Sequence, residues 1–184
     1  QNDFIVYMQD EIENGMASTT IKPGQIKVAS NGNTPQQLDF LRAASRVSAD
    51  TDIMTTAHLG VGTDQDDSRM VHQTLLEAGM KPERLLMCHF QGHVKTTNLE
   101  VRLSEPTAWA PQLDYAREVL DSGTSICFDC FGQTWDTEAM GSESEADSYK
   151  IAAIYQLLEE GYGDQIVVGT DVFLKIMTRR YGGH

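Results

Sequence analysis

The stretch Gln25-Ile26-Lys27-Val28-Ala29-Ser30 carries one lysine within a run that otherwise has the pattern of a β-strand. Successive side chains of a strand point to opposite faces, so Ile26 and Val28 share one face and Lys27 lies on the other. Burying an unpaired ammonium is costly, so a lysine at such a position is expected to stay exposed, to lose its proton or to be chemically modified. We therefore predict both the fold and the site from Lys27 outward.

Three later strand-like runs also end in one residue each that can bind a metal: His58, His89 and Asp171. From Lys27 to His58, and again from His58 to His89, the chain advances 31 residues, which is about the length of one strand-helix-strand unit. We predict that these four residues lie at the carboxyl ends of successive parallel strands and form one site.

Segments with helical periodicity alternate with the strand-like runs. Their apolar residues recur at helical spacing, and glycine, proline or capping residues bound them. The expected helices cover residues 4–15, 35–49, 64–79, 113–120 and 149–160. This alternation predicts an α/β fold with parallel strands, either a barrel or an open sheet, in one domain over residues 1–184. In both architectures the functional loops lie at the carboxyl ends of the strands.

The 184-residue chain has a net charge of −13, from 14 basic and 27 acidic residues. This charge repels nucleic acids and anionic membrane surfaces, so we expect neither as a partner. The sequence has no run of 18 apolar residues that could cross a membrane. Its first residues lack the basic start and apolar core of a signal peptide, and we expect the chain to be part of a longer protein.

The three cysteines are Cys88, Cys127 and Cys130. An odd and small number favours a reducing compartment over a disulfide framework, so we predict a cytoplasmic protein. Cys127 and Cys130 have the C-x-x-C spacing of a redox or zinc pair. Because no second pair accompanies them and Cys127 lies in an apolar run, we interpret both as core cysteines.

The four strand-end residues have the chemistry of a metal site. Two imidazoles and a carboxylate are ligands that suit zinc and related divalent metals. A lysine that has captured carbon dioxide becomes an anionic carbamate, whose two oxygens can bridge two metal ions. Such metals would lower the pKa of a shared water and polarise an ester or phosphoryl oxygen. We therefore predict Lys27, His58, His89 and Asp171 as metal ligands, with Asp171 also accepting the proton of the water.

Two further histidines stand apart from this pattern. His72 lies inside a helical segment between Val71 and Gln73, and His93 lies in a polar loop. We interpret both as structural or solvent-facing, although His93 is close enough to His89 to line a pocket.

Five segments of the chain together resemble the phosphotriesterase-like branch of the amidohydrolase superfamily, in order and separation, over nearly all 184 residues. They are Ile26-Lys27-Val28-Ala29, Thr55-Thr56-Ala57-His58, Cys88-His89, Gly169-Thr170-Asp171 and Arg180-Tyr181-Gly182-Gly183-His184. The resemblance implies a (β/α)8 TIM-type barrel, of which this chain is a partial barrel that covers roughly strands 4 to 8. It also implies a centre of two divalent metal ions, usually zinc, on the C-terminal face of the barrel.

The resemblance also implies a role for each of the four residues. Lys27 looks like the carboxylated lysine that bridges the two metals, and His58 and His89 look like ligands of the more exposed metal. Asp171 looks like the aspartate that holds the more buried metal and shuttles the proton. The implied activity is hydrolysis of a small-molecule lactone, carboxyl ester or phosphotriester by a metal-bound hydroxide. We keep a homodimer open as the assembly.

The chain departs from the family pattern at several points. The His-x-His pair of the first strand has no counterpart, so four of the six usual ligands are present. Lys150 stands where many relatives have arginine. Val172 follows Asp171 where the phosphotriesterases themselves have tryptophan, which counts against efficient organophosphate turnover.

Two other interpretations stay open. One is a catalytically incomplete barrel fragment that binds a ligand or partner without performing chemistry. The other is a flavodoxin-like open sheet that binds a phosphate ligand. The latter is disfavoured because no glycine-rich phosphate loop follows a strand, and Gly60-Val61-Gly62 is too short a match.

Overall fold

The computed structural model describes residues 2–30, 34–59, 64–94, 104, 110–132 and 147–181. Its helices include α1 (Asn2–Asn14), α2 (Pro35–Thr51), α3 (Gln65–Glu77), α5 (Asp114–Asp121) and α6 (Asp147–Glu159). Its strands are β1 (Ile26–Ser30), β2 (Thr55–Leu59), β3 (Leu85–Cys88), β4 (Ser125–Phe128) and β5 (Ile166–Val168). The predicted alternation of helix and strand is confirmed, and no boundary of these five helices departs from its prediction by more than two residues. None of the helices in the described ranges is long and apolar enough to cross a membrane.

Side-chain caps set where α2 and α3 begin. The hydroxyl oxygen of Thr34 accepts the amide N–H of Gln37 at 3.3 Å, while the side-chain oxygen of Gln37 accepts the amide N–H of Thr34 at 3.2 Å. Pro35 occupies the first helical position, where its missing N–H costs nothing. Asp64 caps α3 by accepting the amide N–H of Asp67 at 2.7 Å.

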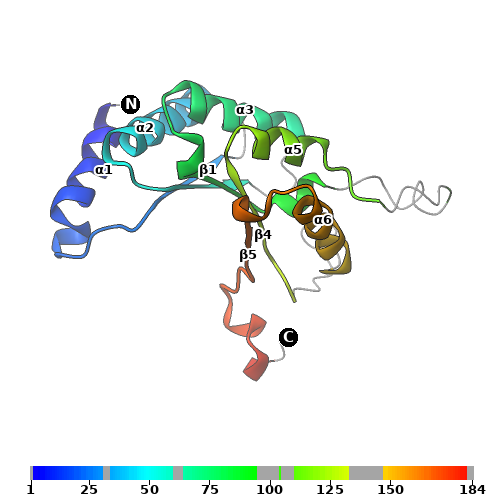
Figure 1. Ribbon diagram of the computed structural model, residues 1–184. Helices are drawn as coiled ribbons and strands as arrows, with labels where there is room; N and C mark the ends of the chain where they lie inside the picture. Colours follow the sequence, from blue (N-terminus) through cyan, green and yellow to red (C-terminus); the bar gives the residue numbers. More distant parts are fainter. Residues whose placement is uncertain are drawn as a thin grey trace.

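The five strands are all parallel and lie in the order β1-β2-β3-β4-β5, so each strand pairs with the next one along the chain. Figure 1 shows α2, α3 and α5 along one side of this sheet, and the segment after β5 standing away from the helices. An unbroken order of this kind is that of a (β/α) barrel, whereas a flavodoxin-like sheet reverses its order at a switch point. The flavodoxin-like interpretation is therefore wrong.

One row of side chains across the sheet faces the helices. The strand register places Val28, Ala57, Met87, Ile126 and Ile166 side by side. The first four are at most 1% exposed and belong to one apolar core with residues of the covering helices. Burial of an aliphatic side chain of this size contributes about 1.5–3 kcal/mol, so this row holds the sheet against its helices.

The next positions of the same strands face the inner side, away from the helices. Lys27 lies beside Thr56 in one inner row, and Ala29, His58 and Cys88 lie side by side in another. Lys27 is exposed between the buried residues Ile26 and Val28, which confirms the predicted alternation of β1.

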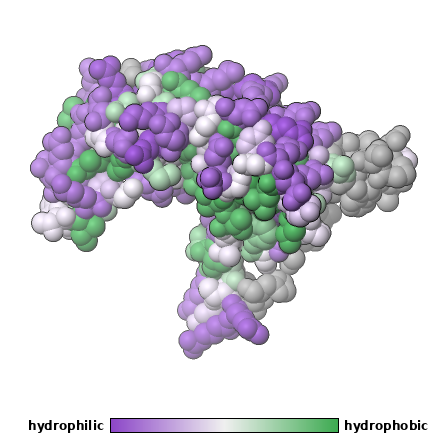
Figure 2. All heavy atoms as spheres, in the orientation of Figure 1, coloured by the Kyte–Doolittle hydropathy of each residue, from purple (hydrophilic) through white to green (hydrophobic). Residues whose placement is uncertain are grey.

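Apolar side chains are also exposed near the end of the sheet. Val167 and Val168 of β5 are 42% and 56% exposed. On α6, Ile151 and Tyr155 are exposed as well. Figure 2 shows apolar atoms gathered over β5 and α6.

Two strands end before the polar residue that was predicted to close them. His89 lies one residue beyond β3, and Asp171 lies three residues beyond β5. Both have a left-handed backbone, with φ of 59° and 46°, as does Cys130 with φ of 58° after β4. This conformation is unfavourable for residues other than glycine, and where it occurs it often belongs to a functional site. The chain thus turns sharply at the carboxyl edge of the sheet, where the site was predicted.

Candidate metal centre

Two histidines meet at the carboxyl ends of β2 and β3. The Nε2 atom of His89 lies 2.8 Å from the Nδ1 atom of His58, and the two rings meet edge to face with centroids 4.3 Å apart. His58 is the penultimate residue of β2 and belongs to the inner row. His89 follows β3 directly, with the left-handed backbone described above. The structure therefore brings these two predicted site residues into direct contact.

Asp129, just beyond β4, holds His89 from the other side. Its Oδ1 atom lies 2.7 Å from Nδ1 of His89, and its Oδ2 atom accepts the backbone N–H of His89 at 3.0 Å. The side-chain amide of Gln91 donates to Oδ1 of Asp129 at 2.8 Å, and its carbonyl oxygen accepts the backbone N–H of Asp129 at 3.1 Å. With Nδ1 of His89 turned to the carboxylate, Nε2 is the ring nitrogen that faces His58.

The surrounding charges act differently on the two imidazoles. Burial lowers the pKa of His58, and the neighbouring His89 and Lys27 lower it further. Burial also opposes a charge on His89, but its hydrogen bond to Asp129 and the charge of that carboxylate outweigh burial and raise the pKa. Burial likewise opposes the charge of Asp129, yet the hydrogen bonds from His89 and Gln91 lower its pKa to about 2. Asp129 is thus a fixed carboxylate at neutral pH, and His58 is neutral, the state in which imidazole binds metals.

Lys27 and Asp171 act on the same rings through their charges. Although burial dominates the pKa of His58, the Lys27 ammonium lowers it and the Asp171 carboxylate raises it. The Oδ2 atom of Asp171 lies 4.0 Å from the Sγ atom of Cys130. Both Lys27 and Asp171 are exposed. Lys27 and Asp171 thus lie close enough to His58 to act on it electrostatically.

Two groups of three donors, drawn from histidine, cysteine and carboxylate side chains, lie close together in the described part of the chain. One is His89, Asp129 and Cys130, and the other is Cys88, Cys127 and Asp129. Within each group the donor atoms lie within 4.8 Å of one another. Asp129 belongs to both groups, whereas His58 and Asp171 belong to neither. Of the predicted ligands in the described part of the chain, only His89 belongs to one of these three-donor groups.

The donor chemistry of the histidine pair suits a divalent metal such as zinc. The two facing nitrogens share one proton, which a cation could replace, and imidazole nitrogens are common zinc ligands. The other nitrogen of His89 is held by a carboxylate, which is the usual outer-shell arrangement around metal-binding histidines. A cation between the two rings would therefore find His89 already oriented.

Asp129 and Gln91 are site residues that the sequence pattern did not identify. Asp129 follows the apolar run Ile126-Cys127-Phe128, which reads as part of one continuous buried strand. One signal was available: the other site residues also follow strand-like runs, and Asp129 is the polar residue in the equivalent place after β4. Gln91 has no comparable signal in the sequence.

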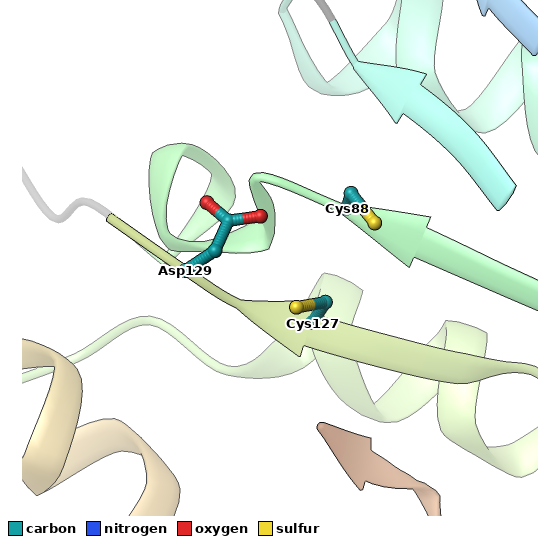
Figure 3. A group of neighbouring side chains, drawn as sticks. All are labelled: Cys88, Cys127 and Asp129. Carbon is teal, nitrogen blue, oxygen red and sulfur yellow. The ribbon is translucent and has the colours of Figure 1, made fainter. Parts of the chain in front are cut away.

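The interpretation of Cys127 and Cys130 as core cysteines is confirmed only for Cys127. Cys127 is buried and Cys130 is half-buried, and all three cysteines are free. The Sγ atom of Cys127 lies within 4.8 Å of the Sγ atom of Cys88 on the neighbouring strand. The neighbouring thiol lowers the pKa of Cys88 and, together with burial, raises that of Cys127. Figure 3 shows these two side chains and Asp129 at the ends of β3 and β4.

Lys150 is buried beneath the turn that follows β4, with 1% of its surface exposed. Its Nζ atom donates to the carbonyl oxygen of Cys130 at 2.7 Å and to Oδ1 of Asp147 at 3.2 Å. It also lies over the ring of Phe131, 4.9 Å from the centroid. Burying a lysine side chain without hydrogen-bond partners is costly, so these contacts tie Lys150 to the turn that carries Asp129 and Cys130.

Comparison with known proteins shows relatives along the whole chain. The family model for the phosphotriesterase family matches residues 2–184. An N-acetyltaurine hydrolase of Dictyostelium discoideum is 28% identical over 185 residues, covering 96% of this chain and 45% of that protein. A phosphotriesterase-related protein of Nematostella vectensis is 28% identical over 181 residues, covering 96% of this chain and 47% of that protein. The chain thus spans about half the length of the curated relatives it matches.

Solved structures show the same relationship in three dimensions. A mutant of an organophosphorus hydrolase from Deinococcus radiodurans superposes with a TM-score of 0.73 at 27% identity, covering 92% of this chain and 44% of that one. A mutant of a phosphotriesterase-like lactonase from the same organism gives 0.73 and 27%, covering 92% of this chain and 46% of that one. The prediction of a partial barrel is confirmed, because the five strands correspond to about half of such a chain.

Proposed function

Because the chain belongs to the phosphotriesterase family, we propose that the protein is a metal-dependent hydrolase whose site lies at the carboxyl ends of these strands. The observation that carries the proposal is the chain of contacts from His58 through His89 to Asp129. It leaves two imidazole nitrogens 2.8 Å apart and fixes one ring by a carboxylate. An arrangement of this kind is typical of metal-binding histidines.

We propose Lys27, His58, His89 and Asp171 as ligands of two divalent metal ions, with zinc as the favoured metal. The histidines offer neutral nitrogens, and Asp171 offers carboxylate oxygens. Lys27 fits the set as an N6-carboxylated side chain, because an ammonium has no lone pair and a carbamate has two oxygens. Bound divalent metal ions would supply Lewis acidity, which activates water and polarises the substrate oxygen.

The protein side chains then have separable tasks in the proposed site. Asp171 accepts the proton of the attacking water, as a carboxylate general base does. Asp129 holds His89 in one tautomer and one orientation. Lys150 stabilises the turn after β4 by donating to the carbonyl oxygen of Cys130. The roles of Asp129 and Lys150 rest on contacts of this chain, and that of Asp171 on the chemistry of a carboxylate.

The proposed substrate is a small molecule with a lactone, carboxyl ester or phosphotriester bond. The similar proteins include an N-acetyltaurine hydrolase, an organophosphorus hydrolase and a lactonase. A panel should therefore include a lactone, an aryl ester, a phosphotriester and N-acetyltaurine. Val172 stands where the phosphotriesterases themselves have tryptophan, which favours the lactone and ester over the phosphotriester. The cytoplasmic location and the homodimer stay predictions.

The alternative is a barrel that binds a ligand or partner without performing chemistry. It is favoured by the position of Asp171, which forms no compact three-donor group with the two histidines in the described part of the chain. Metal content separates the two functions, because a hydrolase site should hold about two ions per chain and a vestigial site fewer, more weakly.

The test is a Lys27→Ala substitution in the full-length protein, assayed for bound metal and for hydrolysis of the panel. Both should be lost, because a methyl side chain offers no ligand atom to a metal. Lys22→Ala is the matched control, since Lys22 is an exposed lysine before β1 and should retain both. Retention of both metal and activity by Lys27→Ala would refute the assignment.

A further inference from the structure

Cys88 and Cys127 lie opposite each other on neighbouring strands. The parallel register pairs Leu86 with Ser125 and Met87 with Ile126. The next position of that register sets Cys88 opposite Cys127, and both side chains face the inner side because the preceding pair faces the helices. Their sulfur atoms lie within 4.8 Å of each other, which agrees with this placement.

A third donor completes the group. Asp129 lies two residues after Cys127, and its carboxylate and the two sulfur atoms lie within 4.8 Å of one another. Among the described residues, Oδ2 of Asp129 accepts a single hydrogen bond, from the backbone N–H of His89 at 3.0 Å. A carboxylate oxygen has two lone pairs, so Oδ2 retains one for a cation. Figure 3 shows the three side chains converging between β3 and β4.

The chemistry of these donors selects the ligand. Two sulfurs and one carboxylate oxygen suit zinc and other thiophilic divalent cations, whereas magnesium and calcium prefer oxygen alone. Zinc binds thiolate sulfur at about 2.3 Å and carboxylate oxygen at about 2.0–2.2 Å, so small side-chain rotations would bring the three donors onto one ion. Two thiols by themselves would equally suit a disulfide. The carboxylate beside them is what favours a cation.

We propose that Cys88, Cys127 and Asp129 form a further metal site, distinct from the histidine pair, that binds a thiophilic divalent cation such as Zn²⁺ or Cd²⁺. Binding releases the two thiol protons to solvent and transfers no electrons. Asp129 also holds His89, so an ion here would sit one carboxylate away from the centre proposed above. The site does not depend on whether that centre hydrolyses anything.

Cadmium titration of the reduced full-length protein tests the proposal. A thiolate-to-cadmium charge-transfer band should grow in the ultraviolet, and both Cys88→Ser and Cys127→Ser should remove it. Cys130→Ser is the matched control and should keep the band, although Cys130 lies close to the same carboxylate. Imidazoles and carboxylates give no thiolate band, so failure of the proposed hydrolase leaves this test readable.

Cadmium-113 NMR of the unmutated protein covers the case in which a serine variant fails to fold. A resonance shifted to the range of a two-sulfur ligand set supports the site, and resonances from nitrogen and oxygen ligands alone overturn it. Survival of the charge-transfer band in the Cys88→Ser/Cys127→Ser double variant overturns it as well, as does equal loss of the band in Cys130→Ser.

Discussion

Two pairs of histidines lie in two different regions of this molecule, one among the helices and one on the inner side of the sheet. His72 and His93 are buried among the helices, and each has a hydroxyl partner. Nε2 of His72 lies 2.9 Å from Oγ1 of Thr124, and Nε2 of His93 lies 3.1 Å from Oγ of Ser68. Burial lowers the pKa of both. These are neutral structural histidines, so the structural interpretation of both is confirmed and neither faces solvent.

The second pair lies on the inner side and has different partners. His58 and His89 face each other, and a buried carboxylate holds His89 and raises its pKa despite burial. Burial alone therefore does not set the two pairs of histidines apart. What distinguishes the inner pair is a charged partner on one ring nitrogen and a second imidazole facing the other.

The largest expected effect comes from exchanging the two kinds of histidine for alanine. In the full-length protein, His58→Ala should reduce metal content and hydrolysis by more than about 100-fold, because loss of a mere outer-shell partner already costs about 10–100-fold. His72→Ala is the control on the helix side, and it should lower stability while the folded protein keeps its metal. Metal analysis and kinetics check both variants. Equal losses of metal would erase the distinction between the two pairs.

The helix side should respond to substitution through stability alone. Leu41 of α2 is fully buried, so Leu41→Ala should cost about 2–5 kcal/mol of unfolding free energy, while activity per folded molecule stays unchanged. Leu38→Ala on the same helix is the matched control. Leu38 is only partly buried, so its loss should be smaller. Urea unfolding measures both, and equal costs would mean that α2 does not pack as described.

The sequence predicted the fold better than it predicted the site. The alternation around Lys27 and the helical periodicities depend on neighbouring residues in the sequence. The helix caps Thr34 and Asp64 can likewise be recognised from residue type and position. The left-handed turn at His89 does not, because nothing in Cys88-His89-Phe90 requires it. Without that turn, the contact between His89 and His58 cannot be deduced from strand alternation.

Contacts between residues on different strands cannot be predicted from a single sequence. In the sequence, Asp129 looks like the end of the apolar run that precedes it. Its partner His89 lies 40 residues away along the chain. The same holds for Cys127, which the C-x-x-C spacing relates to Cys130 but whose sulfur lies within 4.8 Å of that of Cys88. Both contacts depend on the register of β3 against β4, which the pattern of either strand alone does not determine.

Asp129 provides the next test, with an effect between those of a ligand and a surface residue. Asp129→Asn should lower metal affinity or activity by about 10–100-fold, because the amide keeps the shape but removes the charge that holds His89. In the metal-free protein the pKa of His89 should fall, which NMR titration measures. Asp121→Asn is the control, since Asp121 accepts the Tyr162 hydroxyl at 2.7 Å on the helix side. An unchanged pKa of His89 would remove Asp129 from its proposed role.

The smallest effect concerns acid stability, and it comes from His93. Burial lowers the pKa of His93 from 6.5 to about 4, although the charge of Asp64 opposes this. Because the unfolded chain takes up the proton first, the contribution of neutral His93 is complete above pH 6.5. It is lost progressively as the pH falls from 6.5 towards 4.

Between pH 7 and pH 5.5 this linkage amounts to about 1 kcal/mol. His93→Gln removes the titration, so the variant should lose about 1 kcal/mol less than the parent over that interval, even if it is less stable at both values. Urea unfolding at the two pH values measures the difference. A similar loss in both proteins would show that His93 is already accessible to protons in the folded state. The contrast between helix-side and inner histidines would then rest on His72 alone.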